Sequence, residues 1–142
     1  MSKMNLGRVI AGGLVAGLII NIAEGVTNGA ILGQQWKNWA AKMATVTQQP
    51  TSAQAMILWT ILAFALGLIG IWMYAAVRTR FGPGPKTAII VGLVLWILYW
   101  PLVTVQHSAL GTVPLNMEII GDIGGLAGAM LGVLAGAAIY KE

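Results

Sequence analysis

One segment of the sequence carries acid and amide side chains inside an otherwise apolar stretch. Asn21, Glu24 and Asn28 lie between Gly7 and Gly33, where the other residues are mostly apolar or glycine. On a helix with about 100° per residue, Asn28 lies about 40° and Asn21 about 60° from Glu24. The three side chains therefore share one face. A carboxyl group in such a place can bind a cation or carry a proton, so this face is the first candidate for chemistry.

A second group of acids follows near the end of the chain. Glu118 and Asp122 are four residues apart, so they lie on nearly one face of a helix, about one turn from each other. The single histidine, His107, ends the preceding apolar stretch. At about 1.5 Å per residue, Glu24 and Asp122 lie at similar depths below the ends of their stretches. We therefore predict one outward-facing polar pocket formed by Glu24, Asn28, Glu118 and Asp122, with His107 as a further candidate.

The sequence leaves open how the charge of these acids is neutralised. No Lys or Arg lies in the interior of an apolar stretch to pair with them. The acids are then protonated, share a proton, or are neutralised by a cation or a water-filled cavity, and whether a metal ion binds is unknown. A structural role competes with each of these readings. Glu24 can fasten helices as a neutral acid, Glu118 can sit in the wet headgroup region, and His107 can be an interface residue.

Composition defines the class of protein. The chain has 142 residues, of which 58% are hydrophobic and 8% are charged, with a mean hydropathy of +0.81. A soluble domain carries about 25% charged residues, so we predict an integral membrane protein whose main partner is the lipid bilayer. The absence of cysteine excludes disulfides, thiolate metal sites and cysteine nucleophiles. The Lys and Arg residues are scattered, so no nucleic-acid partner is expected.

Four apolar stretches are long enough to cross a bilayer, which takes about 20 helical residues. They cover about residues 7–33, 53–77, 86–110 and 114–140. In the first outer loop, residues 34–48 place Trp36 and Trp39 on one face of a short amphipathic helix, which lies in the interface or acts as a lid. The predicted fold is all-α: a single domain, residues 1–142, formed by an antiparallel four-helix transmembrane bundle with this interfacial helix.

The distribution of cations predicts the orientation. Cytoplasmic loops carry the excess of Lys and Arg. Six of the eight cations lie near one side of the predicted bundle and two near the other; the six are Lys3, Arg8, Arg78, Arg80, Lys86 and Lys141, and the two are Lys37 and Lys42. We therefore expect a multi-pass protein of the bacterial inner (cytoplasmic) membrane with both termini in the cytoplasm.

Rows of glycine suggest how the helices pack. Small residues at every fourth position allow two helices in lipid to approach closely. The last stretch has four such residues and the first has further candidates: Gly124, Gly128, Gly132 and Gly136, then Gly13, Gly17, Gly25 and Gly29. Two interpretations are open. The rows pack the first and last helices together, or they form a homo-oligomer or dock the chain on a larger membrane complex.

The layout resembles that of small, uncharacterised bacterial four-span integral membrane proteins. The features that carry the resemblance are the glycine-rich first stretch with Glu24, the tryptophan-bearing outer segment, and the segment 80–88, Arg-Phe-Gly-Pro-Gly-Pro-Lys-Thr-Ala. The resemblance brings no established activity, so it assigns no functional residue.

Motifs of common enzymes are missing from the sequence. It contains no Walker loop, no dinucleotide-binding fingerprint and no His-Glu-x-x-His motif, so we expect no catalytic residue and no cofactor. The first hypothesis is therefore a non-enzymatic structural or accessory subunit, or a homo-oligomer, packed through its glycine rows. The alternative is a small transporter or channel that uses the carboxylate pocket for a cation or proton. A membrane enzyme acting on lipid or quinone is a third hypothesis.

Overall fold

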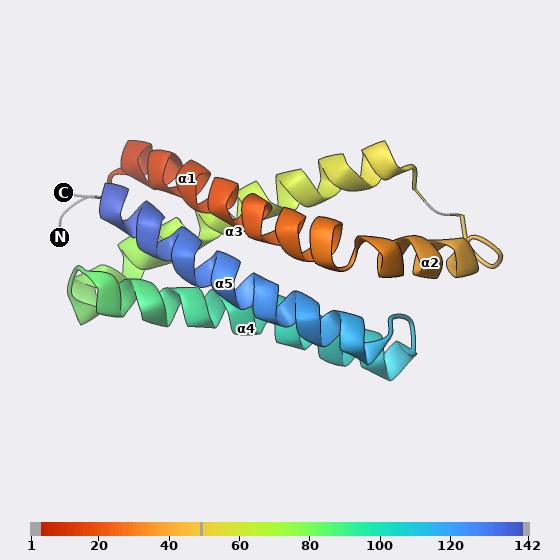
Figure 1. The fold of residues 1–142 in the computed structure, drawn as a ribbon. Coiled ribbons are helices and arrows are strands. Elements are labelled where there is room, and N and C mark those ends of the chain that lie inside the picture. Colours follow the sequence, from red (N-terminus) through yellow and green to blue (C-terminus); the bar gives the residue numbers. More distant parts are fainter. Residues whose placement is uncertain (1–3, 49, 141–142) are drawn as a thin grey trace.

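The computed structural model describes residues 4–48 and 50–140, and these residues form helices and no strand (Figure 1). The predicted all-helical class is therefore confirmed for this part of the chain. Lys3 and Lys141, which were counted for the orientation, lie outside the described residues. The elements in chain order are α1 (Leu6–Glu24), the π-helix η1 (Gly25–Ile31), α2 (Gly33–Met43), α3 (Ser52–Phe81), α4 (Pro85–Leu110) and α5 (Leu115–Ile139).

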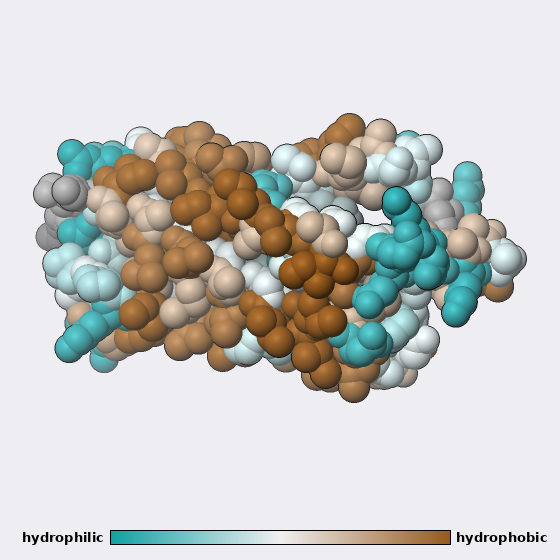
Figure 2. Space-filling view, viewed as in Figure 1, coloured by the Kyte–Doolittle hydropathy of each residue, from teal (hydrophilic) through white to brown (hydrophobic). Residues whose placement is uncertain are grey.

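Four helical segments are long and apolar enough to cross a membrane, with mean hydropathies between 1.7 and 2.3. They are α1 with η1, α3, α4 and α5. Figure 2 shows apolar residues over the middle of the visible face and hydrophilic residues gathered toward both ends. The visible surface thus has the apolar middle and polar ends that suit a membrane protein.

Local sequence explains where α3 begins and ends. Thr51 and Gln54 form a capping box, in which each side chain bonds to the backbone of the other residue, at 3.2 Å and 2.9 Å. The helix continues past residue 77 through Arg78 and Arg80, because cations are favourable in the last turn of a helix. It ends at Gly82, whose φ of 83° suits glycine.

The centre of the core lies where α1 packs between α3 and α5, while α4 packs along α5 (Figure 1). Ala16 and Ile20 of α1, Ile71 of α3 and Val133 of α5 are fully buried there. Successive residues of α1 meet successively earlier residues of α5, since Gly12 faces Gly136 and Ala16 faces Gly132. Small side chains line this contact, so the two backbones approach closely.

The first stretch is not one uninterrupted α-helix as its periodicity suggests. It widens into the π-helix η1, after which the backbone N–H of Leu32 bonds to the carbonyl of Thr27 five residues back, at 2.9 Å. The following helix α2 ends at Met43 instead of continuing to residue 48. After the C-cap residue Ala44 come Thr45, Val46 and Thr47, and β-branched residues are poor helix formers.

The first third of α3 packs less closely than the rest of that helix and contacts α1 near Thr60. In Figure 1 it diverges from α1, and Figure 2 shows an opening between it and the segment leading into α2. None of the residues 52–62 is buried, and Trp59 is 62% exposed. The bundle is therefore closed at the end that holds the termini and open at the end that holds α2.

Candidate functional site

Glu24 lies within a chain of hydrogen bonds that joins four helices, α4, α1, η1 and α2. The indole N–H of Trp100 donates to Glu24 Oε1 at 3.0 Å, and the Asn28 side-chain amide donates to Glu24 Oε2 at 2.7 Å. The indole N–H of Trp36 donates to Asn28 Oδ1 at 3.0 Å. An indole nitrogen can only donate, so the two tryptophans fix the direction of every bond in this chain. Both carboxyl oxygens of Glu24 act as acceptors.

Two glycines of α5 make room for the residues around Glu24. A Cβ atom at Gly125 would overlap the indole nitrogen of Trp100, and a Cβ atom at Gly124 would overlap the hydroxyl of Thr27. The Trp100 ring therefore lies directly on the α5 backbone while its N–H reaches Glu24 on α1. Gly124, predicted as a packing residue, accommodates Thr27 of η1, which is 6% exposed.

A second chain of hydrogen bonds joins α4 to α5. The Thr104 hydroxyl oxygen lies 3.1 Å from Glu118 Oε2 and 2.9 Å from Asp122 Oδ1. His107 Nδ1 lies 2.7 Å from Glu118 Oε1. The His107 side chain is 37% exposed and that of Glu118 is 11% exposed, whereas Thr104 is buried and Asp122 is half-buried. The structure thus brings together three predicted residues, His107, Glu118 and Asp122, through an unpredicted one.

Sequence reasoning missed the polar roles of Thr104 and the tryptophans. Trp96 donates to the backbone carbonyl of Asp122 at 2.8 Å, so α4 contributes Trp96, Trp100, Thr104 and His107 to the two chains. These four residues follow one stripe within about 80° of a helical wheel. The stripe is visible in the sequence and is the signal that could have identified them.

Hydrogen bonds join the residues of the predicted pocket in two groups. The described residues place no hydrogen bond between Glu24 and Asp122; Trp100 bonds to Glu24 and packs on Gly125, three residues after Asp122. Asn21 faces α3 instead. Its amide donates to the Gly17 carbonyl within α1 at 3.0 Å and to the Thr60 carbonyl of α3 at 3.4 Å. The site therefore consists of Glu24 with Asn28 on one side and Glu118 with Asp122 on the other.

Neither Lys nor Arg pairs with these acids within residues 4–48 and 50–140. In the same part of the chain, no group of three or more His, Asp or Glu side chains is arranged to hold a metal ion. The chemistry that the geometry offers is the exchange of protons and hydrogen bonds among carboxyl, hydroxyl and imidazole groups.

Most of the predicted packing glycines lie in close contacts between helices, but two do not. A Cβ atom at Gly128 would lie 3.0 Å from the side chain of Ala23, so this glycine faces α1, as Gly132 and Gly136 do. Gly13 and Gly17 face Leu68 and Phe64 of α3. Around Gly25 and Gly29, by contrast, a Cβ atom would meet no other atom within 4 Å. The glycines of the first stretch therefore make close contacts only before η1, whereas Thr27 of η1 packs closely on Gly124 of α5.

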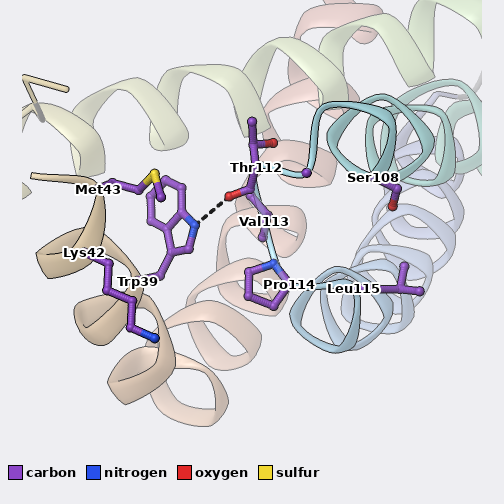
Figure 3. A pocket seen from close by; sticks show the side chains of 9 residues that line it. Trp39, Lys42, Met43, Ser108, Thr112, Val113, Pro114 and Leu115 are labelled. Atoms are coloured by element: carbon purple, nitrogen blue, oxygen red, sulfur yellow. Dashed lines mark hydrogen bonds between the residues drawn. The ribbon is translucent and has the colours of Figure 1, made fainter. Parts of the chain in front are cut away.

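A groove of about 520 Å³ lies beside the site, between α2 and the turn that joins α4 to α5 (Figure 3). Trp39 of α2 crosses it and donates its indole N–H to the carbonyl of Thr112 at 2.8 Å. None of the acids lines this groove. Trp36 and Trp39 therefore attach α2 at two places, one to the Glu24 chain and one to the α4–α5 turn.

No family model, curated protein or solved structure matches this chain. Its function is therefore argued from the geometry of its own residues.

Proposed function

We propose that this protein is a small membrane transporter or channel that binds and moves protons through the acids between its helices. In this proposal the four apolar helices form an antiparallel bundle in the bacterial cytoplasmic membrane, with both termini in the cytoplasm. Three carboxyl groups within candidate spans, none paired with Lys or Arg among the described residues, support this function over a purely structural one.

The observation that carries the proposal is the position of Thr104 between two acids. Its hydroxyl has one proton, so it can donate to Glu118 or to Asp122 but not to both. With two ionised carboxylates, one of the contacts at 2.9 Å and 3.1 Å would bring oxygen lone pairs together. Both contacts become hydrogen bonds when one of the carboxyl groups carries a proton and donates it to Thr104. The arrangement therefore favours one proton shared by Glu118 and Asp122.

The same atoms give the proton a path from the exposed end. His107 binds a proton at Nε2 and passes the proton of Nδ1 to Glu118 Oε1. A proton on Glu118 Oε2 then moves to Thr104 Oγ, and the Thr104 proton moves to Asp122 Oδ1. Proton binding at Nε2 forms an N–H bond, and each later step breaks one N–H or O–H bond and forms one O–H bond. The net change is one proton carried from solvent to Asp122, with the remaining protons left on Nε2 of His107 and Oε1 of Glu118.

The test uses the purified full chain in proteoliposomes with a pH-sensitive dye inside and an imposed membrane potential. We expect wild-type protein to pass protons, and Asp122→Asn or Thr104→Val to reduce the rate at least about tenfold, the usual contribution of a positioned proton-transfer group being about 10²–10⁴-fold. Thr104→Ser keeps the hydroxyl and should conduct. Asn21→Ala, a polar change on the α3 side of α1, is the matched control.

Thermal unfolding in detergent identifies variants that fail to fold, so that loss of flux is interpreted only for folded protein. The proposal is wrong if wild-type vesicles pass no protons at any imposed potential. It is also wrong if folded Asp122→Asn and Thr104→Val both conduct like the wild type.

A second candidate is the structural or accessory subunit, including a homo-oligomer. Six of the eight predicted packing glycines contact neighbouring helices within the chain, so the glycine rows do not favour this candidate. The observation that favours it is the first third of α3, where none of the residues 52–62 is buried.

Cross-linking tests this candidate. Because the chain has no cysteine, a single cysteine can be introduced at Ile61 and, as control, at the exposed Leu131 of α5, and each variant can be oxidised in membranes. A disulfide-linked dimer formed by the Ile61→Cys variant alone would support this candidate; its absence would count against a homo-oligomer through α3.

A further inference from the structure

We propose that the groove between α2 and the α4–α5 turn binds the headgroup of an anionic phospholipid, with Lys42 in contact with the phosphate. This inference requires only that the chain lies in a bilayer and is independent of proton movement. It assigns a ligand to a surface that none of the acids lines.

The groove has an apolar floor and a single charged residue. Met43 lines it from α2, and Val113, Pro114 and Leu115 line it from the opposite side (Figure 3). The bond between Trp39 and the Thr112 carbonyl ties the two sides together at 2.8 Å. The groove is open, with a volume of about 520 Å³. Such a space accommodates a small polar group together with the start of an apolar chain.

Lys42 determines the charge of the ligand. It is the one ionisable residue of the groove, and its side chain is exposed. In the described part of the chain no carboxylate contacts Lys42. The whole segment from Gly25 to Met117 contains no acidic residue, so nothing in α2 or the α4–α5 turn neutralises it. A cation above apolar walls complements an amphipathic anion.

The surroundings favour a membrane lipid over a soluble anion. The groove lies at one end of the apolar helices, beside the tryptophans of an amphipathic helix, which is the composition of the membrane–water interface. Large apolar side chains continue from it along the outside of the bundle, where Leu110 is 69% and Leu115 is 55% exposed. A headgroup held at Lys42 would therefore direct its acyl chains along α4 and α5.

The experiment compares two lysines of the same helix. Full-length protein in mild detergent is titrated with phosphatidylglycerol or phosphatidylcholine, and bound lipid is counted by native mass spectrometry. Lys42→Ala should weaken phosphatidylglycerol binding about five- to tenfold, whereas Lys37→Ala, which removes the same charge outside the groove lining, should leave it unchanged. Phosphatidylcholine should bind weakly to all three proteins.

A second variant keeps both lysines and fills the groove. Ser108→Trp places a large ring in the lining from an exposed position of α4, and it should also abolish the tight phosphatidylglycerol site. Equal losses in Lys37→Ala and Lys42→Ala would overturn the proposal, because binding would then be general surface attraction. Competition by inorganic phosphate at the lipid's own concentration would overturn it too, because the site would then take free anions.

Discussion

In the half of the molecule that holds Gly12, Ala16 and Gly136, α1 and α5 leave no space between their backbones. A Cβ atom at Gly12 would lie 2.6 Å from the carbonyl oxygen of Gly136, and one at Gly132 would lie 2.8 Å from that of Ala16. In the half that holds η1, Gly25 and Gly29 face open space. There the contacts between helices are made by indole, amide, hydroxyl and carboxyl groups.

The difference shows how a short apolar chain separates close backbone packing from polar contacts between helices. Burial from water gives helices in lipid little reason to associate, so close backbone packing has to hold them together. The glycine and alanine contacts supply this at one end. The other end can then leave residues 52–62 of α3 without a buried side chain and keep polar groups between its helices, although such groups are costly in a membrane.

The largest expected effect comes from placing a side chain in the closed half. Gly67→Leu would put a Cβ atom 2.6 Å from Gly17 Cα, so α1 and α3 would have to separate along their contact. We expect a loss of at least about 3 kcal/mol, the upper end of overpacking costs, because backbone rather than a flexible side chain opposes the new atoms. This loss in the free energy of unfolding is measured by circular dichroism as the protein is unfolded with increasing amounts of a denaturing detergent.

Gly121→Leu is the control for that change, because no atom lies within 4 Å of a Cβ placed at Gly121 of α5. It should remain folded under the same conditions. If Gly67→Leu and Gly121→Leu unfold together, the close contact of α1 with α3 does not carry the stability attributed to it.

An intermediate effect is expected in the polar half. Trp100→Phe keeps an aromatic ring against Gly125 but removes the N–H that Glu24 Oε1 accepts at 3.0 Å. Leaving a part-buried carboxyl oxygen without its donor should cost about 1–3 kcal/mol. Trp72→Phe, at a ring that is 53% exposed, is the matched control and should cost less than about 0.5 kcal/mol. Equal losses for the two variants would mean that packing, rather than the hydrogen bond, stabilises this end.

The sequence alone predicts features that lie within a single helix. Run length gave the four long helices, and the spacing of four residues places Asn28 beside Glu24, as the structure has it. Contacts between helices depend on how each helix is rotated about its axis, which a single wheel does not define. For this reason the spacing from Trp96 to His107 shows that these residues share one face of α4, but it does not show which residues of α1 and α5 they contact. The π-helix follows from a shifted backbone bond at Leu32, which has no signature in apolar periodicity.

The smallest expected effect has the opposite sign to the first. Gly29→Ala adds a methyl group in η1 where no atom lies within 4 Å, and alanine favours helical backbone over glycine by up to about 1 kcal/mol. The variant should therefore be as stable as the wild type or slightly more stable, whereas the same substitution at Gly12 should destabilise, because its Cβ atom would meet the Gly136 carbonyl. Unfolding both variants under the same detergent conditions measures the difference between their free energies of unfolding. A loss at Gly29 equal to that at Gly12 would mean that η1 is packed as tightly as the closed half, and the contrast between the two ends of the bundle would no longer hold.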